Sequence, residues 1–193
     1  MPKLGMEPIR RAALVKATIA EIGAAGTLDV TVSQIAKRAG MSSALAHHYF
    51  GGKDQIFLAA MRHILTLYGA EVRGALAMAE GHQRRIEAVV RAGFSTTNFR
   101  NDVIAAWLNF YVLAQTNAEA RRLLSIYQRR LLSNLCHDLR PLVGGRAEAV
   151  AERLAGLIDG LYLRQVLGLR PPSGGAAARH VLAPVDLELK AGS

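Results

Sequence analysis

Apolar residues recur every three or four positions along most of this chain, and this spacing limits the fold more than any other feature of the sequence. One such stripe consists of Ala12, Val15, Ile19 and Ile22. A stripe of this kind lies on one face of an α-helix, whereas a half-buried β-strand alternates apolar and polar residues. No alternating pattern occurs before Pro171. We therefore expect an all-α fold of about eight or nine helices.

The composition agrees with a compact helical protein of one or two domains. The chain has 193 residues, of which 51% are hydrophobic, so a sizeable core is available and global disorder is not expected. A single cysteine, Cys136, excludes a disulfide framework and indicates a reducing compartment. The basic N-terminus lacks the apolar core of a signal peptide, and no stretch approaches the ~20 apolar residues that span a bilayer. We expect a soluble, cytoplasmic protein with no membrane partner.

The positive charge favours partners that are polyanions. The formal net charge is +9. Residues 1–53 hold seven Lys and Arg against three Asp and Glu, so the first quarter of the chain is more positive per residue than the rest. This bias is compatible with nucleic-acid contact near the N-terminus.

Residues 31–50 have the pattern of a helix-turn-helix. Thr31 and Gln34 form a capping box at the start of a short helix. Gly40 ends that helix, and Ser42 is a suitable N-cap for the next one. A capped helix, a glycine turn and a second capped helix are what a helix-turn-helix requires.

Helical spacing continues through the rest of the chain. After the breaker cluster at 171–175 we expect one short helix, at about 175–183, and then a polar tail. Pro141, with the glycines at 144–145, should separate the last two long helices. The helices predicted before that cluster cover residues 8–25, 32–39, 43–49, 53–79, 83–96, 101–114, 118–140 and 146–168.

The stretch HHYFGGKD at 47–54 allows two other interpretations, a metal site and a phosphate-binding glycine loop. Adjacent helical residues point about 100° apart, so His47 and His48 cannot easily share one ion. In a P-loop the lysine is followed by Ser or Thr and a strand precedes the glycines, and neither holds here. We expect no metal, no cofactor and no catalytic residue, and Gly51-Gly52 simply lets the chain turn.

Residue types and spacing in the helix-turn-helix resemble the TetR family of bacterial repressors. The stretches AAWLNFY, RRLLSNL and LIDGLYLR extend the likeness to residue 170 and to the choline-responsive members of that family. The resemblance implies a DNA-binding domain over 1–53 and a helical effector-binding and dimerisation domain over 54–193. The matching residues of the helix-turn-helix are Thr31, Ile35-Ala36, Ala39-Gly40-Met41-Ser42, His48-Tyr49-Phe50 and Lys53.

The second helix of the motif carries the predicted DNA contacts. Ser42 and Ser43 can offer hydroxyl and backbone N–H groups to phosphate, and Leu45 can pack against a thymine methyl group. The resemblance adds Tyr49 and Lys53 as phosphate contacts. The alternative is an ordinary three-helix module with solvated polar residues. The predicted DNA-binding residues are Thr31, Ser42, Ser43, Ala44, Leu45, His47, His48, Tyr49 and Lys53.

Two of these positions depart from the family pattern. Ala44 stands where the family usually has glycine, and His47 stands where it often has tyrosine. Alanine favours the helix by up to ~1 kcal/mol over glycine, so the departure at Ala44 does not threaten the fold. A glycine at that position can serve close approach to DNA, however, so the sequence leaves the operator preference of this chain open.

Aromatic residues gather in the larger predicted domain. Trp107 and Tyr111 share a helix face, and Asp159 lies one turn before Tyr162 in an otherwise apolar run. Aromatic faces with a nearby carboxylate can hold a quaternary ammonium ion, which the resemblance implies as choline or a similar amine. The alternative is that these rings are core and that Asp159 has a structural role. The candidate effector residues are Trp107, Phe110, Tyr111, Tyr127, Asp159 and Tyr162.

The helices at 118–140 and 146–168 carry long apolar stripes. The resemblance implies that such helices pair with those of a second copy, and a two-fold dimer also suits two DNA half-sites. The alternative is packing within one subunit. The candidate dimerisation residues are Leu124, Leu131, Leu135, Leu154, Leu157 and Leu161.

These features favour a repressor that binds operator DNA as a homodimer and is released or modulated by choline. The resemblance implies the genes for choline conversion to glycine betaine as its targets. Three alternatives stay open: a related repressor with a different small amine or hydrophobic effector, an enzyme, and a helical oligomerisation protein without a DNA role. No nucleophile–base pair or paired carboxylates support the enzyme.

Overall fold

The structure, a computed structural model, describes residues 5–168 and 173–190. Within these residues the chain is helical and contains no strand, so the all-α prediction is confirmed. The elements are α1 (Met6–Ala25), α2 (Val32–Arg38), α3 (Ser43–Phe50), α4 (Lys53–Met78), α5 (His82–Gly93), α6 (Asn101–Thr116), α7 (Ala118–Val143), the 3₁₀ turn η1 (Gly144–Arg146), α8 (Ala147–Leu167) and α9 (Gly174–Lys190).

The turn between α2 and α3 has the predicted local chemistry. The Thr31 hydroxyl accepts the Gln34 N–H at 3.1 Å, and the Gln34 Oε1 accepts the Thr31 N–H at 2.7 Å, which confirms the capping box. Ser42 caps α3 by accepting the Leu45 N–H at 3.2 Å. Gly40 has a φ of 68°, a left-handed conformation that glycine adopts without strain.

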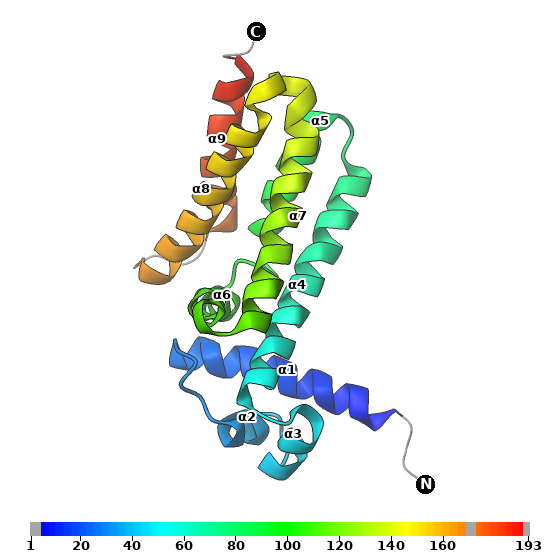
Figure 1. Cartoon of the computed structure of the whole chain (residues 1–193), viewed down its shortest axis with the longest axis vertical. Coiled ribbons are helices and arrows are strands. Elements are labelled where there is room, and N and C mark those ends of the chain that lie inside the picture. The colour runs from blue at the N-terminus through cyan, green and yellow to red at the C-terminus, as the bar shows by residue number, and fades with distance from the viewer. Residues whose placement is uncertain (1–4, 169–172, 191–193) are drawn as a thin grey trace.

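The helices form an elongated molecule with the α1–α3 module at one end (Figure 1). Helix α4 leaves this module and runs along the body, with α7 beside it in the same direction. Helix α5 returns toward the module and packs against both α4 and α7, and α6 crosses the base of the body above α1. Helices α8 and α9 pack on the other side of α7.

One hydrophobic cluster joins the α1–α3 module to the body. Leu14 and Ile35 from the module are buried with Trp107 and Phe110 from α6. A very close helix contact adds to this junction, because a Cβ on Gly23 of α1 would lie 2.4 Å from the Asp102 Cβ at the start of α6.

The far end of the body contains a buried charge network. Asp138 of α7 is only 1% exposed, and its Oδ1 accepts from Arg85 Nε and from His82 Nδ1, each at 2.9 Å. Arg85 also donates to the carbonyl of Leu76 at 3.2 Å. This network therefore ties the end of α4 and the start of α5 to α7.

Proline placement was the main error of the helix predictions. Pro141 lies inside α7, which continues to Val143, because the helix loses a single N–H there while Val143 is buried against the core. Helix α9 begins at Gly174 and passes Pro184 to reach Lys190, since Val181 and Val185 continue its buried stripe. The predicted short helix and polar tail were therefore wrong over residues 184–190. Predictions for residues 171, 172 and 191–193 lie outside the described residues.

Candidate DNA-binding and effector sites

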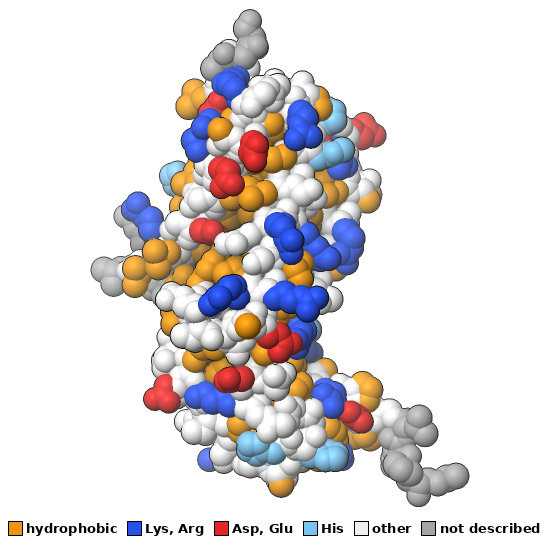
Figure 2. Space-filling view, viewed as in Figure 1, with side chains coloured by type: hydrophobic (Ala, Val, Ile, Leu, Met, Phe, Trp, Pro, Cys, Tyr) orange, Lys and Arg blue, Asp and Glu red, His pale blue; other side chains and the backbone are white. Residues whose placement is uncertain are grey.

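Helix α3 turns one side toward the core and the other toward solvent. Ala46 is fully buried, which fixes the orientation of the helix. Ala44, His47 and His48 are exposed, and Leu45 is half-buried. Histidine side chains are visible at this end of the molecule in Figure 2. The exposed side of α3 is therefore free to enter a major groove, into which a single helix fits.

The hydroxyl groups near the start of α3 already have partners within the chain. The Thr31 hydroxyl donates to Gln34 Oε1 at 2.9 Å while it caps α2. Ser43 Oγ donates to Ser33 Oγ at 3.1 Å. Ser42 only accepts in its cap, so its O–H proton remains available to a phosphate oxygen.

Basic and aromatic side chains meet where α1 passes the end of α3. Arg10 Nη1 donates to the Tyr49 hydroxyl at 3.5 Å, and the Arg11 guanidinium lies 5.5 Å from the centre of the Tyr49 ring. Lys53, at the first position of α4, has its Nζ 5.6 Å from the centre of the Phe57 ring. This group can hold a DNA backbone by charge and hydrogen bonds.

The two adjacent histidines face different surroundings. His47 Nδ1 lies 3.4 Å from the carbonyl oxygen of Gly51, while the His48 ring lies 5.5 Å from that of Tyr49. In the described part of the chain, no three His, Cys, Asp or Glu side chains are grouped so that they could hold a metal ion.

Four of the candidate effector residues come together between α6, α7 and α8. The buried Trp107 ring lies 4.6 Å from the Tyr127 ring and 6.0 Å from the Tyr111 ring, measured between centroids. The Tyr111 hydroxyl donates to Asp159 Oδ1 at 2.9 Å. We call Trp107, Tyr111, Tyr127 and Asp159 the aromatic–carboxylate cluster.

Asp159 is a partly buried carboxylate without a cationic partner among residues 5–168 and 173–190. Its only hydrogen-bond donor there is the Tyr111 hydroxyl. Burial raises the pKa of Asp159, and the hydrogen bond from Tyr111 opposes that rise. Burial and then the charge of Asp159 raise the pKa of Tyr111, so its phenol stays protonated and donates. A cation beside this carboxylate would therefore favour its charged form, which burial alone disfavours.

The other two candidates, Phe110 and Tyr162, adjoin this cluster. The Phe110 ring lies 6.1 Å from the Trp107 ring, and burial, followed by Tyr68 and Asp159, raises the pKa of Tyr162. Phe110 is 1% exposed and contributes to the core that joins α1 to α6. The Tyr162 hydroxyl donates to the carbonyl of Gly93, and its ring packs 5.6 Å from Phe94 and 5.1 Å from Phe99. The burial of Phe110 therefore favours a role in the hydrophobic core over a role in binding the effector.

Two family models match this chain. The model described as "Bacterial regulatory proteins, tetR family" matches residues 14–60, and the model described as "BetI-type transcriptional repressor, C-terminal" matches residues 82–190. The chain belongs to the TetR family of transcriptional repressors. It is therefore a DNA-binding repressor with a BetI-type C-terminal domain, and members of this family bind operator DNA as dimers.

Curated relatives agree with this assignment over nearly the full chain. The HTH-type transcriptional regulator BetI of Brucella anthropi is 51% identical over 190 residues, covering 98% of each chain. The BetI regulator of Rhizobium meliloti is 46% identical over 192 residues, covering 99% of this chain and 95% of the relative.

Solved structures share the fold. A transcriptional regulator from Pseudomonas aeruginosa is 27% identical with a TM-score of 0.80, covering 96% of this chain and 93% of the other. A regulator from Saccharomonospora viridis, crystallised in complex with choline, is 23% identical with the same TM-score of 0.80, covering 91% and 95%. Within the described residues of the present chain, none of the helices combines the length and hydropathy needed to cross a membrane.

The candidate dimerisation leucines divide into two groups. Leu131, Leu135 and Leu154 are buried in the core of their own subunit, so the prediction that they face a second copy is corrected in favour of packing within the subunit. Leu124, Leu157 and Leu161 are half-buried and keep part of their surface open. Only these three remain candidates for a dimer contact.

Sequence reasoning did not single out several residues around the cluster. The Tyr68 ring of α4 lies 5.6 Å from the Tyr127 ring, and burial raises the pKa of Tyr68. Glu71, also on α4, accepts from Ser95 at 2.7 Å and from Asn98 at 2.6 Å. The one signal in the sequence was the place of Tyr68 in the inward stripe of its helix. Its contacts could not be predicted, because the residues around it come from distant segments.

Proposed function

We propose that this repressor binds operator DNA through α3 and is released or modulated by choline or a similar quaternary amine. In this proposal residues 1–53 are the DNA-binding domain and residues 54–193 the effector-binding and dimerisation domain. The two α3 helices of a dimer enter successive major grooves. Target genes are those for conversion of choline to glycine betaine, and the protein acts in the cytoplasm without catalysis.

The DNA contacts follow from what is exposed at the α1–α3 end. Ala44, Leu45, His47 and His48 supply the groove-facing side of α3. The Ser42 hydroxyl, Tyr49 and Lys53 contact backbone phosphates, with Arg10 supporting Tyr49. Thr31 and Ser43 act mainly by holding the turn, because their hydroxyl protons are already donated within the motif.

The effector assignment rests on one observation, the partly buried Asp159 carboxylate beside aromatic rings. A quaternary ammonium ion cannot donate an N–H hydrogen bond, so it is best held by ring faces and a nearby negative charge. Trp107, Tyr111 and Tyr127 offer such faces, and Asp159 has no cation of its own within the described residues. Each cation–π contact contributes about 0.5–2 kcal/mol.

Effector and DNA sites are connected by two helices. Helix α4 begins at Lys53 and extends through the body. Helix α6 carries Trp107 and Tyr111, and it also packs against α1 at Gly23. A cation that changes the position of α6 or α4 changes the spacing of the two α3 helices in the dimer. The two affinities are then coupled reciprocally, typically by about 1–3 kcal/mol.

Titration of choline into a complex of the dimer with its operator tests this proposal. We expect choline to alter the DNA affinity of the wild type and to lose this effect in Asp159→Asn. Asp186→Asn, a change of the same charge on the exposed face of α9, should respond like the wild type.

The outcomes distinguish the proposed effector from the alternatives. No choline effect on the wild type would reject choline. An effect that survives in Asp159→Asn would move the effector site elsewhere. A response to neutral hydrophobic compounds that ignores Asp159 would support a related repressor with a different effector.

A further inference from the structure

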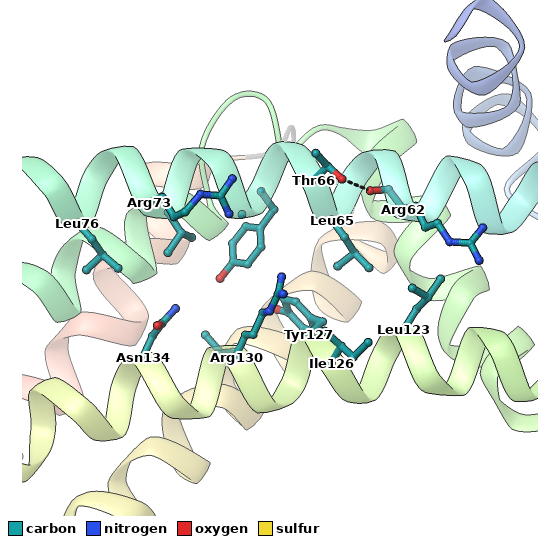
Figure 3. Close-up of a pocket in the computed structure, with 14 residues that line it drawn as sticks. Arg62, Leu65, Thr66, Arg73, Leu76, Leu123, Ile126, Tyr127, Arg130 and Asn134 are labelled. Atoms are coloured by element: carbon teal, nitrogen blue, oxygen red, sulfur yellow. Dashed lines mark hydrogen bonds between the residues drawn. The ribbon is translucent and has the colours of Figure 1, made fainter. Parts of the chain in front are cut away.

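A cleft of about 640 Å³ lies between α4 and α7 (Figure 3). Its volume is within the range of small-molecule sites, about 300–1,000 Å³. Apolar side chains from both helices supply most of its lining surface. They are Leu65, Val72, Leu76, Leu123, Ile126 and Leu131.

The charged residues of this cleft are all arginines. Arg62, Arg73 and Arg130 line it, and no carboxylate does. Arg62 pairs with Glu119 at the end near α6. Arg73 and Arg130 are exposed and form no ion pair with the described residues. In Figure 3 Arg130 extends from α7 toward α4. The middle of the cleft is therefore positive.

Side-chain groups that have no hydrogen-bond partner among the described residues also line the cleft. The hydroxyls of Tyr68 and Tyr127 and the amide of Asn134 form no hydrogen bond with other described residues. No buried side-chain oxygen or nitrogen in the described chain lacks a partner, so these groups remain open to the cleft. An oxygen acceptor on a ligand in the cleft can accept from such groups as well as from a guanidinium group.

We propose that this cleft binds a small amphipathic anion with an oxyanion head group, a carboxylate or a phosphate, on an apolar chain. The head group is held by Arg73 and Arg130, which can form charge-assisted and bidentate hydrogen bonds. The chain lies on the leucine, isoleucine and valine side chains of α4 and α7. This site takes a charge opposite to that of the proposed quaternary amine, so it is a second ligand site.

The cleft and the aromatic–carboxylate cluster share one wall. The Tyr127 ring lines the cleft on one side and packs 4.6 Å from the Trp107 ring on the other. Trp107 is the only tryptophan of the chain, so its fluorescence reports on a ligand that contacts Tyr127. This gives a direct measurement of binding that does not depend on DNA.

The test is titration of the full-length dimer with decanoate and with decyl phosphate, followed by Trp107 fluorescence and calorimetry. Acetate and decanol are the controls for the head group alone and the chain alone. We expect at least one of the two long-chain anions to bind more tightly than either control. The better of the two identifies the head group.

The variant that tests the site is Arg73→Gln with Arg130→Gln. We expect it to bind the anion roughly ten-fold more weakly or worse, because two charge-assisted contacts are lost. Arg73→Lys with Arg130→Lys should recover part of the affinity. The control of equal charge is Arg84→Gln with Arg122→Gln, two exposed arginines outside the cleft, and it should bind like the wild type.

The proposal is overturned if neither anion binds, if decanol binds as tightly as the anions, or if the Arg73/Arg130 glutamine variant binds like the wild type. The choline response of that variant should persist, and Asp159→Asn should still bind the anion. Failure of the anion site therefore leaves the proposed effector site standing, and the reverse also holds.

Discussion

Replacement of Asp138 by asparagine should destabilise the protein although it changes no residue of either proposed ligand site. Asp138 is 1% exposed, and its Oδ1 accepts from Arg85 and His82. Breaking a buried ion pair by changing one partner typically costs about 3–5 kcal/mol. Arg85 and His82 side chains are 29% and 44% exposed, so water can partly replace the lost acceptor. We therefore expect a loss of about 2–3 kcal/mol of unfolding free energy.

For a chain of this size each kcal/mol corresponds to about 2–4 °C, so the Tm should fall by roughly 4–12 °C. The assay is thermal and urea unfolding followed by circular dichroism, at one fixed protomer concentration because dimerisation contributes to apparent stability. Asp186→Asn is the control, since Asp186 is exposed and accepts only a 3.4 Å hydrogen bond from Gln83. An Asp138→Asn protein within about 0.5 kcal/mol of the wild type would refute the role given to this network.

Three further predictions concern the DNA module, the helix junction and pH. Lys53→Ala should weaken operator binding and lower the slope of log affinity against log salt by about 1, as measured by fluorescence anisotropy; an unchanged slope would contradict a phosphate contact. Gly23→Ala should destabilise the fold by about 1–3 kcal/mol in urea unfolding, because its Cβ would meet the Asp102 backbone at 2.6 Å; wild-type stability would show that the junction yields easily. Burial raises the pKa of Asp159 in the folded chain, so ionisation of this carboxyl group reduces stability. The stability is fully present below the pKa of Asp159 in the unfolded chain and is lost as pH rises through its pKa in the folded chain. Asp159→Asn should therefore be more stable than the wild type at pH 7, with the difference vanishing at low pH, while choline binding by the wild type weakens on acidification.

Local chemistry made the N-terminal module predictable from the sequence. The capping box at Thr31 and the N-cap at Ser42 depend on residues within three positions of each other, and both are present. The proline errors have the opposite origin. Pro141 and Pro184 stay within helices because tertiary burial of Val143 and Val185 outweighs the local cost of proline, and burial of this kind is not visible in a sequence window.

The candidate sites were only partly predictable for a related reason. The Tyr111–Asp159 hydrogen bond joins residues that a family resemblance had already grouped. The contact of Tyr68 with Tyr127 depends on α4 and α7 lying side by side, and spacing along one helix does not specify its neighbour. An apolar stripe also does not distinguish burial in its own subunit from burial against a second copy, which is why Leu131 and Leu135 were assigned to the wrong surface.

The close approach of α1 and α6 at Gly23 makes that point a pivot. Side-chain layers between helices can absorb small shifts by changing rotamers, but at Gly23 the two backbones have no such layer between them. Gly23 lies near one end of α1, and the other end is about 25 Å away at 1.5 Å per residue. A tilt of about 2° at the pivot would move that far end by about 0.9 Å. Arg10 and Arg11 lie toward that end, next to Tyr49, so a sub-ångström adjustment of α6 becomes a displacement comparable to the tolerance of a hydrogen bond to DNA phosphate.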